Sequence, residues 1–572
     1  MAAQSGHLGQ QKDIAGYLGS DLPEPVRLAY QEGHDADIPS NEGVVEPPLI
    51  RHLVQPLSSS AREEIELEKG EPLDKSETTS LNGSHLQSGE IGAEKHQPTT
   101  ITEEQLDPNI VFWDGENDPA NPINWSAGKK WGNIAVLSAM TFLTPPASSM
   151  FAPGVPAAMK EFDSHSNLIA TFVVSIYVLG FAIGPLVCAP MSELYGRLIV
   201  YHVCNVGFIA FTIACAVAPS MGSLIAFRFF AGVLGVAPVT IGGGTIADLM
   251  PPARRGGEMA IWAMGPLLGP VVGPVGGGFL SESQGWRWIF WVIAMALGVT
   301  SISAVIFLRE TYAPVLLQWK TKRLQKETGN MSLRSKLDTG LSPRQLFTRA
   351  IVRPAKLMFL SPICAAMSLY MAVVYGFLYL LFTTFAFVFE DQYGFSNSIV
   401  GLVYLGLGLG NFIGLALLGF TSDRVMARLA KKNGGDIKPE YRLPLLMYAG
   451  PFIPVGLFIY GWTAQYEVQW AVPLVGTMFV GIGLIACFMC INTYLVDTFT
   501  LYAASAMAAN TILRSIFGGV FPLFGLQMYD GLGLGWGNSL LAFLALAMCP
   551  IPWFFYHYGK RIRTYPRFQV EF

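Results

Sequence analysis

The sequence has few charged residues and lacks the motifs that hold nucleotides or metals. Only 14% of its 572 residues are Asp, Glu, Lys or Arg, whereas an average soluble domain carries about 25%. Three scattered histidines follow residue 110, and no Walker loop, HExxH motif or serine nucleophile elbow is present. We therefore expect no enzyme, no cofactor, no metal and no nucleic-acid partner.

Cysteine is scarce, and the positions of the cysteines do not suggest a set of disulfide bonds. All seven cysteines fall in apolar stretches, where sulfur behaves as a small hydrophobe. They are Cys188, Cys204, Cys215, Cys364, Cys487, Cys490 and Cys549. We expect no disulfides, and the CxxC at 487–490 has no second pair, so it indicates core packing.

The N-terminal part differs in composition from everything after it. Residues 1–110 hold 20 acidic against 7 basic residues and few aromatics, a composition that cannot bury enough apolar surface to offset chain entropy. It predicts a disordered, acidic, cytoplasmic tail. Residues 111–133 then bring Asp, Pro and Asn turn residues together with aromatics, which is typical of a connector next to a membrane.

Long apolar runs fill the remainder. A membrane-crossing helix needs about 20 mostly apolar residues, and twelve such runs are present. The predicted spans are 134–156, 168–190, 198–219, 222–248, 257–281, 287–308, 362–387, 396–421, 442–462, 470–496, 502–527 and 535–556. The sequence therefore predicts an all-α membrane protein of about twelve transmembrane helices, surrounded by lipid.

Lysine and arginine collect on one side of these spans. Segment 309–361 is rich in both, and so is the tail 557–572. Since positive loops stay in the cytoplasm, we expect both termini to be cytoplasmic. The basic segment 309–361 separates two predicted bundles of six helices, 134–308 and 362–556. This arrangement suggests internal duplication.

A local echo supports the duplication. The text APMSELYGRL at 189–198 and GFTSDRVMAR at 419–428 each follow the second span of a half, with an acid and then a basic residue in a short turn. We interpret them as a structural gate; the alternative is a helix cap or a solvated charge. The gate residues are Glu193, Gly196, Arg197, Asp423, Arg424 and Arg428.

The loop after span two resembles a motif of the fungal twelve-span drug:proton antiporters of the major facilitator superfamily. The match includes Pro190, Ser192, Glu193, Gly196 and Arg197. RETYAPVLL at 309–317 and NTYLVDTFTLYAASAMAAN at 492–510 extend it. Ala189, Leu194 and Leu198 depart from the superfamily pattern and leave the gate fewer charge contacts. The resemblance runs from Trp113 to the C-terminus and implies the major facilitator fold with proton-coupled export.

Span five carries a repeating glycine and proline pattern, GPLLGPVVGPVGGG. Its members are Gly265, Pro266, Gly269, Pro270, Gly273, Pro274 and Gly277. Glycines four residues apart line one helix face and allow a neighbouring backbone to approach closely, while each proline removes a backbone donor. The pattern resembles the family's antiporter motif; the alternative is a tight helix interface with no bearing on direction.

Charges at membrane depth are costly and usually functional. Arg228 in span four and Arg514 in span eleven cannot lose their protons, so each is expected to tune a neighbouring acid or to hold substrate. Asp248 and Asp497 end spans four and ten and are expected to act in gating or coupling; the alternative is a simple helix-end charge. The proton-binding residue is not identified.

Aromatic and amide side chains suggest where an apolar ligand binds. Candidates are Tyr370, Tyr375, Tyr379, Asn492 and Tyr494, since aromatic walls with sparse polar groups suit bulky apolar ligands. Lipid contact or helix packing is the alternative for each residue.

The leading hypothesis is proton-coupled efflux of small amphipathic toxic compounds, either antifungal drugs or fungal secondary metabolites. We expect the protein to be a monomer whose partners are its substrate, protons and the lipid bilayer. Uptake of a nutrient on the same fold is the alternative, and a membrane receptor is disfavoured. We expect the plasma membrane, with the vacuolar membrane as the alternative.

Overall fold

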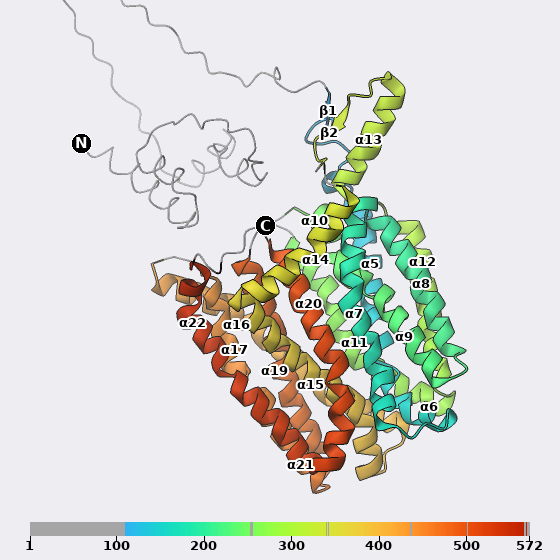
Figure 1. The fold of residues 1–572 in the computed structure, drawn as a ribbon, viewed down its shortest axis with the longest axis vertical. Helices are drawn as coiled ribbons and strands as arrows, with labels where there is room; N and C mark the ends of the chain where they lie inside the picture. The colour runs from blue at the N-terminus through green and yellow to red at the C-terminus, as the bar shows by residue number, and fades with distance from the viewer. Residues whose placement is uncertain are drawn as a thin grey trace, which may run out of the picture. The chain divides into compact units, whose positions relative to one another are not determined.

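The structure is a computed structural model, and it describes residues 109–251, 255–338, 340, 342–434, 438–499, 502–565 and 568. The predicted tail, apart from its last two residues, lies outside this part of the chain. The described residues are almost entirely helical (Figure 1).

Six spans make up the first half. Its helices are α5 (Ala127–Ser149), η3 (Ala152–Gly154), α6 (Val155–Glu161), α7 (Asn167–Tyr195), α8 (Arg197–Ala216), α9 (Met221–Gly235), α10 (Ala237–Leu249), α11 (Arg255–Ser283) and α12 (Arg287–Phe307). The first span comprises α5 to α6, and the fourth comprises α9 and α10. Three prolines lie inside α11, yet it remains one helix.

The second half repeats this organisation. Its helices are α15 (Pro362–Tyr393), α16 (Asn397–Lys432), η5 (Pro439–Arg442), α17 (Leu443–Ala449), α18 (Phe452–Gln465), α19 (Ala471–Thr498), α20 (Ala503–Val520), α21 (Pro522–Met548) and α22 (Pro550–Arg563). The chain reverses inside α21 at Gly533, whose φ of 75° is not helical. The eleventh span therefore runs from α20 into α21, and the twelfth from α21 into α22, as Figure 1 shows.

Among the described residues, eleven helical segments are long and apolar enough to cross a membrane. They do not include α20, which carries Arg514 and Asn510 in only 18 residues. Because the segment Pro522–Arg563 contains the reversal at Gly533, it holds parts of two spans. The all-α membrane fold with two sets of six helices is confirmed.

Several helices extend beyond the predicted spans. α5 begins at Ala127, inside the segment assigned to the connector, and α22 continues to Arg563, inside the assigned C-terminal tail. The segment 419–428, expected as a turn, is helical because α16 runs to Lys432. Hydropathy marks the apolar part of a helix, whereas the backbone hydrogen bonds continue into the polar part.

The connector and the basic segment fold together. β1 (Ile110–Val111) pairs in parallel with β2 (Arg334–Ser335), and η2 (Pro122–Asn124) follows β1. Lys320 of α13 (Ala313–Thr328) donates to the carbonyl of Phe112 at 2.9 Å. α14 (Pro343–Leu360) is capped by Ser342, which accepts from Gln345 N–H while the Gln345 side chain accepts in return. The end of the bundle near these elements is called the basic end below.

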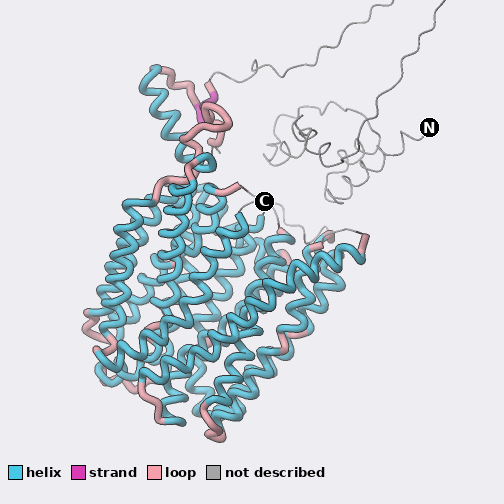
Figure 2. The backbone as a smooth tube through the Cα atoms, turned by 180° about the vertical axis from the view of Figure 1, so that it is seen from behind, coloured by secondary structure: helices cyan, strands magenta, loops and turns pink. Residues whose placement is uncertain are grey.

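The two halves contact each other at the opposite end. Asn167 of α7 donates to the carboxylate of Asp530 at 2.7 Å, and the backbone N–H of Ser398 donates to Glu282 at 2.8 Å. The ribbons of the two halves lean apart toward the basic end in Figure 2.

Candidate functional site

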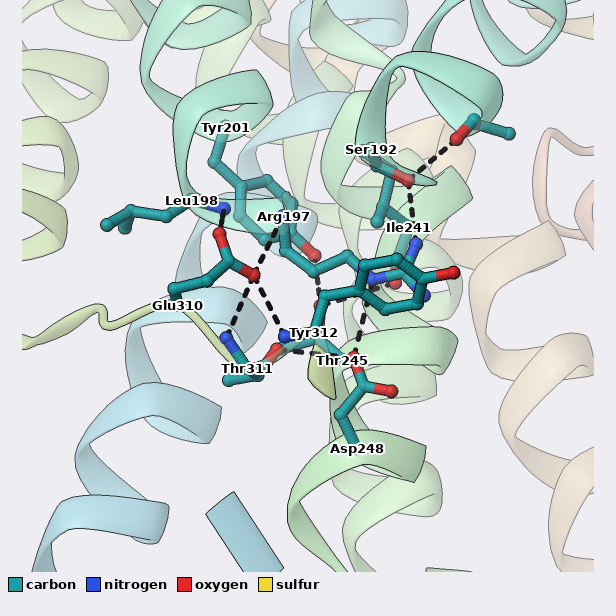
Figure 3. Close-up of polar contacts among 11 residues, drawn as sticks. Ser192, Arg197, Leu198, Tyr201, Ile241, Thr245, Asp248, Glu310, Thr311 and Tyr312 are labelled. Atoms are coloured by element: carbon teal, nitrogen blue, oxygen red, sulfur yellow. Dashed lines mark hydrogen bonds and ion pairs between the residues drawn. The ribbon is translucent and has the colours of Figure 1, made fainter. Parts of the chain in front are cut away.

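A buried carboxylate organises the basic end of the first half (Figure 3). Glu310 is 5% exposed and follows the end of α12. It accepts hydrogen bonds from the first two backbone N–H groups of α8, those of Arg197 and Leu198, each at 3.0 Å. These donors have no partner within their own helix, and the positive end of the helix favours a carboxylate. The Glu310 carboxylate therefore fixes span six to span three.

The side chain of Arg197 connects two further helices. Its Nη1 donates to Ser192 Oγ at 2.7 Å and its Nε to Asp248 Oδ2 at 3.3 Å. The guanidinium lies 4.4 Å from the ring centroid of Tyr312, and burial raises the pKa of the Tyr312 hydroxyl above its usual range. Arg197 and Asp248, predicted separately, thus form one cluster across α7, α8 and α10.

The second half has the same cluster with a different arginine. Arg442 donates from Nε to Asp497 Oδ2 at 3.1 Å and from Nη1 to Ser422 Oγ at 3.2 Å. Asp497 was predicted as a gating or coupling residue, whereas Arg424 and Arg428, predicted as gate residues of this half, are exposed on α16. The Asp423 side chain lies outside the described residues. Arg442 was not predicted as a site residue, because it lies 20 residues after its partner Ser422. In the first half, Arg197 follows Ser192 within the same short motif.

Gly196 and Glu193 have distinct places beside this cluster. Gly196 joins α7 to α8 with a φ of 95°, and a Cβ there would lie 2.3 Å from the Glu310 carboxylate. Glu193 lies in the last turn of α7 and is exposed. Glu310 was not predicted as a site residue, although it belongs to the quoted text RETYAPVLL.

The glycine face of α11 packs against α5. Added Cβ atoms would lie 2.9 Å from Phe142 N at Gly265 and 2.6 Å from the Pro146 ring at Gly269. At Gly277 the Cβ would lie 1.8 Å from the carbonyl oxygen of Met150. Gly273 is equally close to α5, with Ser149 Oγ at 2.6 Å. This face is therefore a helix contact and not a lipid surface.

Arg228 is 1% exposed in the middle of the first half. Its Nε donates to the Val173 carbonyl at 2.6 Å and its Nη2 to the Ser148 carbonyl at 3.0 Å. Three aromatic rings surround the guanidinium, with centroids at 5.1 Å for Phe151, 5.5 Å for Tyr177 and 5.7 Å for Phe290. Arg228 thus ties span four to spans one and two through backbone carbonyls.

Arg514 occupies the second half at the boundary with the first. Its guanidinium lies 4.9 Å from the Tyr375 ring and 5.4 Å from the Phe488 ring. One turn earlier on α20, Asn510 donates to Asn492 Oδ1 at 2.8 Å. A Cβ on Gly518 would touch both Tyr375 and Val178 of α7, so this group lies where α20 meets the first half.

The predicted aromatic residues fall into two groups. Tyr379 contacts the Tyr375 ring at 5.1 Å and exchanges a hydrogen bond with Ser148 Oγ at 3.2 Å, across the two halves. Tyr370 is instead buried near Gly450, and Tyr494 near Gly559. The structure therefore brings Tyr375, Tyr379 and Asn492 together with Arg514, and separates Tyr370 and Tyr494 from them.

Comparison with known proteins places this architecture in a family. The model of the Major Facilitator Superfamily matches residues 137–522. The chain is 60% identical over 470 residues to the efflux pump radE of Floropilus chiversii, covering 82% of this chain and 87% of that protein. It is 55% identical over 507 residues to the MFS-type transporter penM of Penicillium rubens, covering 87% and 100%.

Solved structures show the same fold. The partially occluded inward-open xylose transporter XylE from E. coli superposes with a TM-score of 0.57 at 15% identity, covering 75% of this chain and 98% of that one. The chain belongs to the major facilitator superfamily, and it is a multi-pass membrane transporter related to fungal members of that family. The family resemblance seen in the sequence is confirmed.

Proposed function

We propose that the protein exports small amphipathic compounds from the cytoplasm by alternating access, in exchange for protons. The observation that carries this proposal is the matched cluster of serine, arginine and aspartate at the basic end of each half. Ser192, Arg197 and Asp248 brace one half, and Ser422, Arg442 and Asp497 brace the other. Two halves that are each braced internally move as units about their shared interface.

The direction of transport rests on two supports. Relatives at high identity include one named an efflux pump, and the glycine face of α11 resembles the antiporter motif of span five. Its close contact with α5 couples the fifth span to the first. Substitutions that separate these helices are expected to impair the exchange of states.

The basic end is proposed to face the cytoplasm, because lysine and arginine favour that side. Both termini then lie inside the cell. In that orientation, the contact between Asn167 and Asp530 at the opposite end supports an inward-facing state. We propose that the protein acts in the plasma membrane and that it acts as a monomer.

Energy for export is proposed to come from a proton gradient. The sequence holds no phosphate loop, and one charge crossing the membrane is worth about 2.3 kcal/mol per 100 mV. Arg228 contributes by fixing spans one, two and four, because its guanidinium is bound to carbonyls of α5 and α7. Backbone carbonyls do not titrate, so the proton-carrying group is not one of these hydrogen-bond partners of Arg228.

The experiment is transport of a preloaded fluorescent substrate in proteoliposomes under an imposed pH gradient. We expect transport to collapse when a protonophore dissipates the gradient, and to be unchanged by ATP. Arg228→Ala should abolish gradient-driven transport, and Arg228→Lys should restore it only partly because lysine lacks the planar fork. Transport that ignores the gradient and requires ATP would overturn the mechanism.

A further inference from the structure

We propose that Arg514, Asn510 and the rings of Tyr375 and Phe488 form a substrate subsite that selects weakly acidic hydroxyaryl compounds and rejects lipophilic cations. The proposal rests on the transport function above and specifies the chemical class of its substrate. The subsite lies on α20 where this helix meets the first half.

The first observation is a pair of buried polar atoms without partners. Asn510 is 1% exposed, and its Oδ1 accepts no hydrogen bond although its Nδ2 donates to Asn492. The Nε of Arg514, one helical turn away, is buried and donates none. Leaving such groups unpaired is costly, so a site that tolerates them is built for a ligand that pairs with them.

The two orphan atoms define a complementary ligand. The Arg514 Nε–H requires an acceptor, such as a carboxylate, a phenolate or a carbonyl oxygen. The Asn510 Oδ1 requires a donor, such as a hydroxyl. Since residues four apart lie on one helix face, both needs are met by one compound with an acceptor and a hydroxyl on the same ring system.

Aromatic rings border this polar pair. The Arg514 guanidinium lies 4.9 Å from the Tyr375 ring centroid and 5.4 Å from that of Phe488, and Phe488 precedes Asn492 by one turn of α19. Tyr375 in turn contacts Tyr379, which is hydrogen-bonded to the first half. A flat aromatic ligand beside Arg514 would therefore contact rings that also connect the two halves.

The charge of the region determines which ligand it attracts. No Asp or Glu occurs in residues 361–389, 468–496 or 498–529, the segments that supply the subsite. Within those segments Arg514 is thus a positive charge without a carboxylate. Glu390 and Asp391 lie in the last turn of α15, and Asp497 lies in the last turn of α19, where it accepts from Arg442. In a region of low dielectric, such a charge attracts anions and repels cations strongly.

The experiment compares two dyes that share one scaffold and differ in charge. Fluorescein carries a carboxylate on its pendant phenyl ring and a phenolic hydroxyl on its xanthene, and rhodamine 123 is a cationic xanthene whose pendant carboxyl group is a methyl ester. Their binding to the purified full-length protein in nanodiscs is measured by fluorescence anisotropy at pH 5.5, where fluorescein is an anion that keeps its hydroxyl. We expect fluorescein to bind roughly tenfold tighter or more, as for one charge-assisted hydrogen bond.

Variants assign the preference to the subsite. Arg514→Gln should weaken fluorescein binding about tenfold and leave rhodamine binding weak, while Arg514→Lys should retain part of the affinity. Asn510→Asp places a carboxylate beside the guanidinium and should shift the preference toward rhodamine. The control is Arg323→Gln, because Arg323 is exposed on α13. Thermal unfolding of each variant verifies folding, and Arg514→Lys with Asn510→Asp suffices if Arg514→Gln does not fold.

Equal affinity for the dyes, tighter binding of rhodamine, absence of fluorescein binding, or an Arg514→Gln variant with unchanged fluorescein affinity would each overturn the proposal. Because the assay measures binding, its result is independent of energy coupling. Gradient-independent transport together with the expected dye preference would contradict only the transport mechanism.

Discussion

At the scale of single residues, the link between span three and span six depends on a glycine. Gly196 has a φ of 95°, which L-residues with a Cβ rarely adopt, and its missing side chain leaves room for the Glu310 carboxylate. That carboxylate accepts the first N–H groups of α8. Any side chain at 196 therefore both strains the backbone and displaces the buried acid.

We predict that Gly196→Ala lowers stability by about 2 kcal/mol or more, because backbone strain and a lost buried hydrogen bond each cost about 1–3 kcal/mol. The matched control is Gly285→Ala, since Gly285 has a φ of 90° but no atom within 4 Å of an added Cβ. Thermal unfolding of the detergent-solubilised variants measures both. Equal losses for the two variants would show that the Glu310 contact contributes nothing.

Asp118 provides a pH-dependent contact between the connector and α13. Its carboxylate accepts from the N–H groups of Asp114 at 2.9 Å and Ala120 at 2.8 Å, and Lys320 lies 3.7 Å away. These hydrogen bonds, and secondarily Lys320, lower the pKa of Asp118 below its usual value. The stabilisation is therefore complete above the unfolded-state pKa of about 3.9 and is lost as pH falls through the lower folded-state value.

We predict equal protection of residues 109–118 from hydrogen exchange at pH 7 and pH 5, after correction for intrinsic rates. Asp118→Asn should reduce this protection at both pH values, whereas Glu116→Gln should not. Protection in the wild type that falls between pH 7 and pH 5 would contradict the assigned direction.

At the scale of elements, α11 shows how a sequence pattern determines packing. Its glycines meet α5 along one face, and the closest approach is at Gly277, where a Cβ would lie 1.8 Å from the Met150 carbonyl oxygen. Backbone on both sides leaves no flexible side chain to move. Even a methyl group must therefore separate the first and fifth spans.

We predict that Gly277→Ala lowers stability by about 1–3 kcal/mol and reduces the transport rate in proteoliposomes. The control is Gly298→Ala in α12, where an added Cβ has no atom within 4 Å. A Gly277→Ala variant with wild-type stability and transport would show that this contact is required for neither.

The spans were predictable because a run of about 20 mostly apolar residues is typical of a membrane-crossing helix. Their ends were less predictable, since α16 and α22 extend as helices through polar residues that hydropathy excludes. Arg197, Asp248 and Asp497 were predicted as candidate site residues, and the structure pairs Arg197 with Asp248. Arg424 and Arg428 were predicted in the second half, but Arg442, which is the arginine that bonds to Asp497, was not. Local spacing does not reveal a partner that tertiary packing brings from a later part of the chain.

At the scale of the whole molecule, the two halves are related by the serine, arginine and aspartate clusters at their basic ends. The aspartate partner of each arginine comes from a helix distant in sequence, so the pairing of Arg442 with Asp497 emerged only from the structure. Arg228 and Arg514 lie in different halves, and the contact between Ser148 and Tyr379 connects their surroundings. We propose that these halves move relative to one another during transport.

The most direct test joins the halves at the opposite end. Asn167→Cys with Asp530→Cys places thiols where the native side chains lie 2.7 Å apart, and a short bis-methanethiosulfonate reagent links them. The control pair, Glu161→Cys with Arg287→Cys, replaces a 2.8 Å ion pair within the first half. We predict that cross-linking 167 to 530 stops transport until a reductant is added, while the control cross-link does not. Full transport with 167 and 530 cross-linked would contradict alternating access.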